Sequence, residues 1–421
     1  MKNENHKSFR QPATANGSDT GLSRRQFGAL ARRYGYTAAT MAVFGLPSLA
    51  TFSEIAEAAA AKAADEAAMK KKADVVLVLG MEGTVNRWPN GAVTKGSMQN
   101  WGCIEFKKML QEATGGRMYV DLFDGAPFGA QTKALRKIQQ GVFQVGNCST
   151  QNAAAVAPVW NVLDFPYAIG PVENMWKVTF SPEIEATVRK KSMEANIALI
   201  FNVPAHRWLE IGYGVKHEIR KPDDLKGLKI RVTDSKLEQA AFKLLPSNPT
   251  PVAWPETFGA LKSGAVDGIH VPTTATLDAG LGPVVGQMVS TEWMYGNDAT
   301  WINVAWVKKQ TPAMQEAIWN TSFRVQEYIF QNFERLMRDQ NGLRVDSPPG
   351  VGWREYEPKG MRWVRLTPAE IAVWKDYLSI ERNGKFLNEL IDRFGRKEYE
   401  AVVRVANAAG KAEARPWWGK A

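Results

Sequence analysis

Apolar residues follow two different periods in the first half of the chain. Short, uniformly apolar runs have the pattern of buried parallel strands, and between them apolar residues recur on one helical face. These patterns predict a strand at 75–79, a helix with Cys103, Phe106 and Leu110 on one face, a strand at 118–123, a helix at 133–140 and a strand at 142–146. A β-α-β-α-β order predicts a parallel sheet with helices on both faces.

The pattern then repeats. It predicts a strand at 197–203, a turn at 222–227, a strand at 228–232, a short helix at 255–262 that stops at Gly264, and a strand at 266–271. A helix from Pro312 to about Asp339 is long enough to span two lobes. Residues 341–365 contain three prolines and four glycines and predict an irregular insertion, and a helical tail follows at 368–408. Two α/β units joined by a long helix predict a hinged, two-lobed molecule with a cleft between the lobes.

Length and composition agree with this organisation. A chain of 421 residues predicts two domains rather than one, and 45% hydrophobic with 23% charged residues indicates a folded globular protein. The net charge is +10, but Lys and Arg are scattered and form no stripe for nucleic acid. An anionic ligand and a solubilising surface explain the charge equally well.

Motifs for catalysis or for a metal are missing from the sequence. Two cysteines, Cys103 and Cys148, build no disulfide framework or zinc cluster, although their own pairing stays open. Four histidines form no metal motif, and there is no GxGxxG after a strand, no P-loop and no G-x-S-x-G. We therefore predict no catalytic residues, no metal and no cofactor.

The N-terminal region carries the features of an export signal. Residues 1–20 are polar and predict disorder; Ser23 to Phe27 spells Ser-Arg-Arg-Gln-Phe, and a mildly apolar run and an alanine-rich segment follow. This order resembles a twin-arginine signal. A membrane anchor is the alternative, but the run at 34–53 contains glycines and a proline and is weakly hydrophobic for a span. We expect a periplasmic protein that begins between Ala60 and Ala73.

Two paired motifs resemble a known family. Residues 224–232 read Asp-Leu-Lys-Gly-Leu-Lys-Ile-Arg-Val, and residues 256–268 read Glu-Thr-Phe-Gly-Ala-Leu-Lys-Ser-Gly-Ala-Val-Asp-Gly. Together they resemble the signature of the solute-binding proteins of tripartite ATP-independent periplasmic (TRAP) transporters, the DctP-like family. Weaker matches lie at 125–129 and 164–167, and the resemblance extends from about residue 74 to 340.

The resemblance implies a fold and an anchor for the ligand. The fold is the type II periplasmic-binding-protein α/β fold, with two α/β lobes, a hinge and a long lobe-spanning helix. The arginine of the Lys-Ile-Arg-Val strand, Arg231, is expected to hold a ligand carboxylate through its rigid fork of donors, near the end of a strand where α/β proteins bind ligands. A structural ion pair is the alternative for Arg231. A second family arginine matches Arg207, with a solvated surface arginine as the alternative.

Further candidates surround these arginines. Relatives carry a polar or acidic pair where this chain has Ile269-His270, so a carboxylate ligand for a cation is missing and no metal is predicted. His270 contacts the ligand or is a satisfied structural residue. Asn147 and Ser149 offer polar groups to a ligand or cap the next helix. Aromatic walls are expected from Trp254, Phe258 and Trp293, against the alternative that they are core.

The expected function is capture without chemistry. We expect a small organic acid to bind in the cleft and to be delivered to the small and large TRAP membrane subunits by a monomer or dimer that binds no nucleic acid. A twin-arginine-exported enzyme and a ligand-sensing receptor are the alternatives. The expected division is a disordered head and signal at 1–66, a first lobe at 74–204 plus 297–337, and a second lobe with the C-terminal helices at 205–296 plus 338–415. The identity of the carboxylate stays open.

Overall fold

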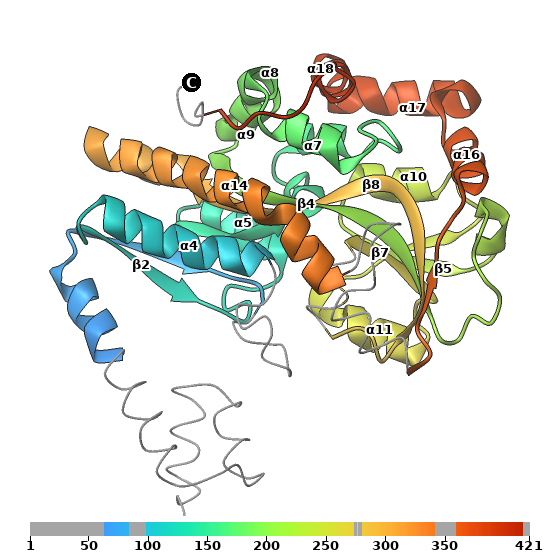
Figure 1. Ribbon diagram of the computed structural model, residues 1–421, viewed down its shortest axis with the longest axis horizontal. Coiled ribbons are helices and arrows are strands. Elements are labelled where there is room, and N and C mark those ends of the chain that lie inside the picture. The colour runs from blue at the N-terminus through green and yellow to red at the C-terminus, as the bar shows by residue number, and fades with distance from the viewer. Residues whose placement is uncertain (1–62, 84–97, 273–275, 277–279, 342–358, 416–421) are drawn as a thin grey trace, which may run out of the picture. The chain divides into compact units, whose positions relative to one another are not determined.

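The computed structural model describes residues 63–83, 98–272, 276, 280–341 and 359–415 (Figure 1). The chain divides into two compact units, Met1–Ala68 and Met69–Ala421. Most of the first unit, with the predicted export signal, lies outside the described residues. The architecture below is that of the second unit.

The described strands form one nine-stranded sheet. Its order is β2-β1-β3-β8-β4-β7-β5-β6, and β9 pairs with β8. The strands are β1 (Val75–Gly80), β2 (Met118–Phe123), β3 (Val145–Ser149), β4 (Ile197–Gly212), β5 (Lys229–Val232), β6 (Asn248–Pro251), β7 (Gly268–Pro272), β8 (Val285–Asn303) and β9 (Arg362–Val364).

The first lobe is built around β1, β2 and β3. These three strands are parallel, as the β-α-β-α-β pattern predicts. The first helix, α4 (Met98–Ala113), buries Cys103, Phe106 and Leu110, and α5 (Gln131–Gln139) buries its own apolar face. The third strand begins at Val145 rather than at Val142, because Val142 follows the glycine that ends α5 and is 63% exposed.

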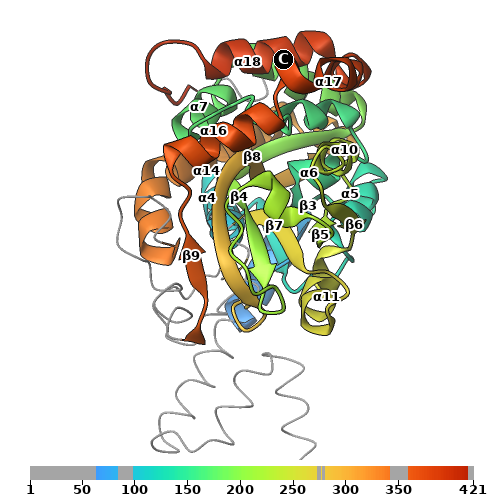
Figure 2. The same cartoon turned by 90° about the vertical axis from the view of Figure 1, so that its right-hand side faces the viewer.

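Two long strands connect the lobes. β4 and β8 pair antiparallel from Ile197 opposite Asn303 to Gly212 opposite Val285, with three shifts of register along the way. Figure 2 shows β8 curving alongside β4. The sequence patterns predicted only the first seven residues of β4 and none of β8. Because β8 pairs antiparallel with β3 and β4, the whole sheet is mixed, and the predicted parallel pairing holds within β1, β2 and β3 but not at the centre of the sheet.

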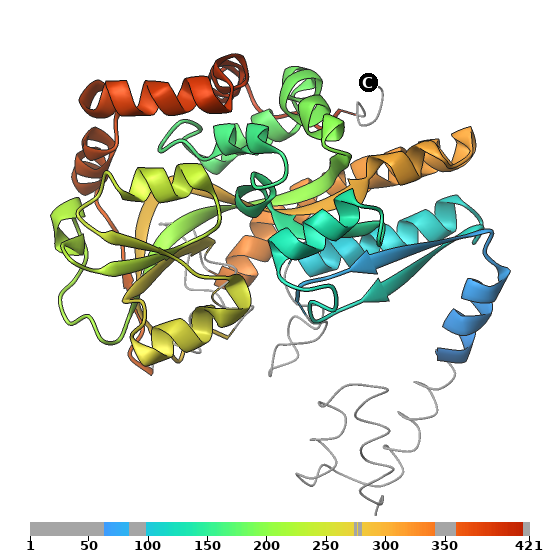
Figure 3. The ribbon, with the colours of Figure 1, turned by 180° about the vertical axis from the view of Figure 1, so that it is seen from behind.

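The second lobe is built around β5, β6 and β7. β5 pairs parallel with β6 and β7, and β7 pairs antiparallel with β4. Figure 3 shows the two lobes from behind, on opposite sides of the long strands. The predicted short helix is α11 (Thr257–Ser263), and it ends as expected at Gly264, whose φ of 73° is left-handed.

Helices cover the faces of the sheet. The long predicted helix is α14 (Pro312–Asn341), which packs against α4 and β4. Residues 63–72 are also helical. Further helices are α6 (Thr150–Ala153), η1 (Pro158–Leu163), α7 (Val172–Thr179), α8 (Pro182–Ile184), the π-helix η2 (Glu185–Arg189), α9 (Lys190–Glu194), η3 (Pro222–Leu225), α10 (Lys236–Phe242), η4 (Trp254–Glu256), α13 (Val304–Lys308), α16 (Pro368–Tyr377), α17 (Ile380–Phe394) and α18 (Arg396–Ala406). None of the described helices is long and apolar enough to cross a membrane.

The helical tail contacts both lobes. α16 packs against β8 and η3, whereas α17 and α18 pack against η1, and α18 also contacts α7. Buried residues of α17 and α18, such as Leu387 and Val402, share an apolar cluster with the first lobe. We therefore propose that the tail bridges the lobes rather than belonging to the second alone. The predicted irregular insertion lies partly outside the described residues, and its described end forms β9.

Each lobe has its own apolar core. Two clusters lie in the first lobe, one around β3, η1 and the tail and one around α4, β1 and α14. Two further clusters gather mainly around β5 and β7. Since β4 and β8 continue from one lobe into the other, they are the natural place for a hinge.

Candidate ligand site

Arg231 is the third residue of the four-residue strand β5, and its side chain is buried. The residue is 2% exposed, and its Nε donates to the carbonyl oxygen of Val252 at 2.9 Å. The guanidinium lies 5.6 Å from the centre of the Trp254 ring. Within the described part of the chain, no carboxylate forms an ion pair with it, so the predicted alternative of a structural ion pair finds no support. Burial lowers the pKa of Arg231 to about 10, which leaves it charged at neutral pH.

Arg207 lies in β4 and is buried against a carboxylate. Its Nη2 is 2.7 Å from Oε1 of Glu238, a buried residue of α10, and it also donates to the carbonyl oxygen of His270. Arg207 is therefore not the solvated surface arginine of the alternative reading. Its Nε and Nη1 are buried without a hydrogen-bond partner among the described residues. Two donors of this guanidinium remain for another acceptor.

His270 completes this buried cluster. Its Nδ1 lies 2.9 Å from Oε1 of Glu238. Burial, together with the charge of Arg207, lowers the pKa of His270 to about 4. Burial alone would raise the pKa of Glu238, but the charge of Arg207 and the bond from His270 hold it at about 2. The ring is therefore neutral at neutral pH, and Nδ1 carries the proton that it donates to the carboxylate.

Asn147 and Ser149 both lie in β3 but make different contacts. Asn147 is buried, and its Nδ2 donates to Thr300 Oγ1 at 2.8 Å. The Ser149 hydroxyl accepts from the backbone N–H of Asn152 and caps α6, which is the alternative that the sequence left open. The neighbouring thiols Cys103 and Cys148 are both free and buried.

The three aromatic candidates are separated. Trp254 lies over Arg231, whereas Phe258 lies on α11 and is 37% exposed. Trp293 is 1% exposed and packs against Phe242 and His270 in the core of the second lobe. Of these three, the structure brings only Trp254 to the guanidinium of Arg231.

Sequence reasoning missed two carboxyl groups near the arginines. Glu82 lies one residue beyond the residue that follows β1, and Gln131 donates to its Oε2, while its Oε1 is buried without a partner among the described residues. Burial raises the pKa of Glu82 to about 7 and that of Asp298, on β8, to about 6. One signal in the sequence could have identified Glu82. It lies just beyond the carboxyl end of a predicted parallel strand, where α/β proteins hold ligands.

Hydrogen bonds join the two lobes beside these groups. The backbone N–H of Asp234, which follows β5, donates to Asn152 Oδ1 at 3.3 Å, and Thr132 Oγ1 donates to Asp234 Oδ2 at 3.1 Å. Ser235 Oγ likewise donates to Asn161 Oδ1 at 3.1 Å. The loop after β5 is thus tied to α5, α6 and η1 of the first lobe.

A groove of about 580 Å³ opens beside these bonds. Its lining includes Thr132, Asn161 and Asp234 from the joined segments, and the cations Arg136, Lys236 and Arg393. The volume suits a small molecule. The three cations are exposed, however, and none of the eight predicted site residues lines the groove.

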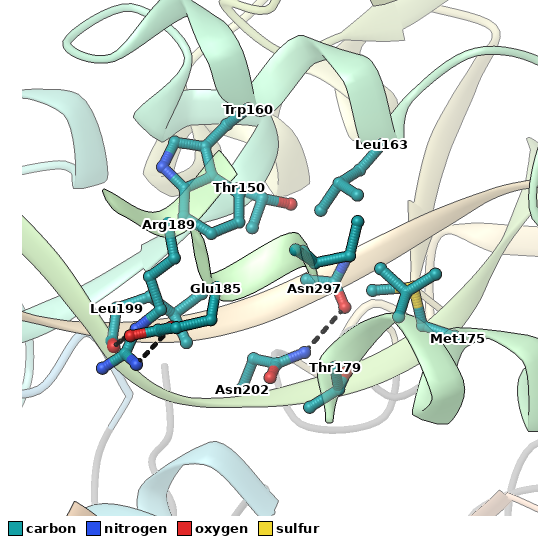
Figure 4. Close-up of a pocket in the computed structure, with 12 residues that line it drawn as sticks. Thr150, Trp160, Leu163, Met175, Thr179, Glu185, Arg189, Leu199, Asn202 and Asn297 are labelled. Carbon is teal, nitrogen blue, oxygen red and sulfur yellow. Dashed lines mark hydrogen bonds and ion pairs between the residues drawn. The ribbon is translucent and has the colours of Figure 1, made fainter. Parts of the chain in front are cut away.

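A second, smaller cavity lies inside the first lobe (Figure 4). Side chains from α6, η1, α7, η2, β4 and β8 surround it, including Asn202 and Asn297, which are hydrogen-bonded at 2.9 Å. Its volume of about 30 Å³ is room for a few water molecules and is far below the several hundred Å³ of ordinary ligand pockets. It is too small to hold an organic acid.

The two-lobed α/β fold, together with the matches to known proteins, places the chain in the class of solute-binding proteins of transporters, which are not enzymes. The chain belongs to the bacterial extracellular solute-binding proteins of family 7, DctP, whose model matches residues 90–378. The predicted resemblance to TRAP solute-binding proteins and the predicted fold are therefore confirmed.

Relatives with known names are distant. A solute-binding protein of Verminephrobacter eiseniae is 26% identical over 65% of this chain and 77% of its own length. The 2,3-diketo-L-gulonate-binding periplasmic protein YiaO of Escherichia coli is 26% identical over 52% of this chain and 66% of its own length. The C4-dicarboxylate-binding periplasmic protein DctP of Rhodobacter capsulatus is 21% identical over 73% and 86%.

Solved structures share the fold. A TRAP periplasmic solute-binding protein of Ralstonia eutropha with bound (S)-2-acetolactate has a TM-score of 0.66 at 21% identity, covering 79% of this chain and 98% of the other. One from Polaromonas, bound to D-erythronate, has a TM-score of 0.67 at 19% identity, covering 80% and 100%.

Proposed function

We propose that this protein captures a small organic carboxylate between its lobes, with Arg231 as the anchor, and delivers it to the small and large membrane subunits of a TRAP transporter. The observation that carries the proposal is the buried guanidinium of Arg231, which forms no ion pair with any described carboxylate. A buried charge is costly unless it is paired and hydrogen-bonded. A ligand carboxylate supplies both the charge and two acceptor oxygens.

Arg207 is the proposed second contact. Its two unpartnered donors are available to the same guest, while Glu238 fixes the position of the guanidinium. Asn147 and Trp254 are proposed as further lining. His270 is proposed to act indirectly, because its Nδ1 donates to Glu238, which holds Arg207 in place. Ser149 is likewise proposed to act indirectly, by capping α6. Phe258 and Trp293 stay weaker proposals because Phe258 lies on α11 with 37% of its surface exposed and Trp293 is buried in the core of the second lobe.

The relatives support an acidic ligand. The Escherichia coli and Rhodobacter capsulatus proteins are named for 2,3-diketo-L-gulonate and C4-dicarboxylates, and the two structural neighbours hold acetolactate and erythronate. All of these molecules carry a carboxylate. We propose the same class here and leave the body of the ligand open.

Closure of the lobes is the proposed mechanism. Carboxylate binding lets both lobes contact the ligand, and this differential affinity draws β4 and β8 toward a closed form. The loop after β5 then meets α5 and α6, as its hydrogen bonds indicate. We further propose periplasmic localisation, as for the Escherichia coli relative, and export by the twin-arginine route.

The test is a thermal-shift screen of the purified protein against keto acids, sugar acids and dicarboxylates. A binding acid raises the melting temperature by mass action, and Arg231→Ala removes the shift while the protein stays folded. Arg136→Ala, which removes an exposed arginine of the groove, is the matched control and keeps the shift. An unchanged shift in Arg231→Ala contradicts the anchor, and uptake by vesicles with the membrane subunits separates transport from sensing.

A further inference from the structure

Glu82 occupies an unusual position for a carboxyl group in a protein that binds acids. It extends from the end of β1, its Oε2 accepts from Gln131, and its Oε1 is buried without a partner among the described residues. Its backbone N–H lies 3.4 Å from Oδ1 of Asn147. A buried carboxylate oxygen without a donor is unfavourable when the group is ionised.

The charged groups around Glu82 come from several elements. Asp298 of β8 and Arg231 of β5 act on it directly. The charges of three further residues act on Arg231: Glu238 of α10, Arg207 of β4 and Asp234 of the loop after β5. Gln131 of α5 and Asn147 of β3 are neutral. Two more neutral groups lie nearby: Cys148, whose thiol burial keeps protonated, and Asp164, whose pKa burial raises to about 8.

Three carboxyl groups, those of Glu82, Glu238 and Asp298, therefore interact with the guanidinium groups of Arg207 and Arg231. With all three ionised, the carboxylates outnumber the two guanidinium groups before any ligand arrives. Adding an anion at Arg231 brings a further negative charge into a region of low dielectric. The added negative charge favours the neutral form of one of these carboxyl groups.

We propose that Glu82 takes up a proton when an anionic ligand binds at Arg231, which makes capture proton-linked. This inference rests on the proposed function and concerns the regulation of the same site. Glu82 is proposed as the acceptor because this half-buried residue combines a buried, unpartnered carboxyl oxygen with an electrostatic interaction with Arg231. Its raised pKa of about 7 places the exchange near neutral pH. The neutral carboxyl also gains an O–H that can donate to a ligand oxygen.

The linkage fixes the direction of the pH dependence. Below about pH 7, Glu82 is already protonated and the affinity is flat. Above that value, the free protein has lost the proton that the complex holds, and the dissociation constant rises by up to about tenfold per pH unit. The rise ends at the higher pKa that Glu82 has in the complex.

The experiment is isothermal titration calorimetry of the full chain with D-galacturonate, D-erythronate and succinate as probes. Each is titrated at pH 8 in phosphate and in Tris, whose heats of ionisation differ, and then across pH 6 to 9 in one buffer. Proton uptake appears as a binding heat that depends on the buffer, corresponding to between half a proton and one proton per ligand. A heat that is independent of the buffer overturns the proposal.

Two variants assign the proton. Glu82→Gln mimics the neutral carboxyl, so it is expected to lose the pH dependence and to bind more tightly than the wild type at pH 8.5, by about tenfold. Asp298→Asn keeps the dependence. An undiminished pH slope in Glu82→Gln moves the proton elsewhere and overturns the assignment.

A further measurement needs no variant. Infrared difference spectra of the wild type, with and without the probe, are expected to show a new band from a protonated carboxyl at pH 8. A spectrum without this band contradicts the uptake even if Glu82→Gln fails to fold. The absence of binding by all three probes at pH 6 and throughout the acid screen overturns the proposed function itself, whereas binding without proton uptake overturns only this inference.

Discussion

At the scale of single residues, the two arginines predicted to bind the ligand have different surroundings. Arg207 is buried against Glu238, whereas Arg231 has no ion-pair partner among the described residues. The motif predicted Arg231 because its neighbours match a family signature. It could not predict the pairing of Arg207, because Glu238 lies 31 positions further along and reaches Arg207 only through the fold.

Arg207→Ala tests this structural role. The change leaves the carboxylate of Glu238 buried with His270 and Thr233 but without its countercharge. Removing one partner of a buried ion pair is expected to lower the free energy of unfolding by about 3–5 kcal/mol. Urea unfolding measures the change, and the exposed Arg136→Ala serves as control, with an effect within about 0.5 kcal/mol. Equal stability of both variants contradicts a structural contribution from this pair.

The raised pKa of the buried Asp164 predicts how the stability of the protein depends on pH. Burial raises its pKa to about 8 from an ordinary value of 3.8, so the folded protein holds a proton that the unfolded chain has lost between these values. The stability that this carboxyl contributes is fully present below its unfolded pKa and is lost as the pH rises through 8. Asp164→Asn, which keeps an acceptor for Gln151, is expected to flatten this loss.

Urea midpoints of wild type and Asp164→Asn at pH 5, 6, 7 and 8 measure the effect. The free energy difference between the two proteins is expected to change by on the order of 1 kcal/mol per pH unit. Asp223→Asn, at an exposed position, is the matched control and leaves the slope unchanged. Parallel curves for wild type and Asp164→Asn would show that the folded protein holds no extra proton at this position.

At the scale of elements, the sequence predicted those helices and strands whose signals lie in their own residues. β1, β2, β5, α4, α5 and α11 fall close to their predicted ranges because their apolar periods and glycine stops are local. β8 was not predicted because it is buried on both faces over nearly its whole length. Such a strand lacks the alternation of apolar and polar residues that reveals a half-exposed strand. β6, with the sequence Asn-Pro-Thr-Pro, escaped because two prolines argue against a strand except at an edge, where it lies.

The end of α11 gives a matched pair of glycine substitutions. Gly264 has a left-handed φ of 73°, whereas Gly259 lies inside the helix, and an added Cβ meets nothing within 4 Å at either position. Gly264→Ala is therefore expected to lower the free energy of unfolding by about 1–2 kcal/mol, through backbone strain alone. Gly259→Ala is expected to stabilise by roughly 0.5–1 kcal/mol through helix propensity. Urea midpoints of the two variants are expected to move in opposite directions, and a shared direction would contradict the assigned helix end.

At the scale of the whole described unit, we expect the affinity for a ligand to depend also on hydrogen bonds between the lobes. The backbone N–H of Asp234 donates to Asn152 Oδ1, and Thr132 Oγ1 donates to Asp234 Oδ2. Opening of the lobes is expected to break both bonds. Local pattern could not reveal these bonds, because they link segments about 80 and 100 residues apart. The energy of such contacts adds to the affinity of any ligand that closes the cleft.

The double variant Thr132→Val with Asn152→Ala removes both bonds. A net hydrogen bond contributes about 0.5–1.5 kcal/mol, so the ligand dissociation constant is expected to rise at least two- to tenfold. Lys236→Ala is the control, because this exposed neighbour of the same loop makes no described bond to the first lobe. Small-angle scattering is expected to show a more expanded ligand-free double variant but an unchanged complex at saturation. If affinity falls while the ligand-free dimensions stay those of the wild type, the two bonds act on the ligand site and not on closure.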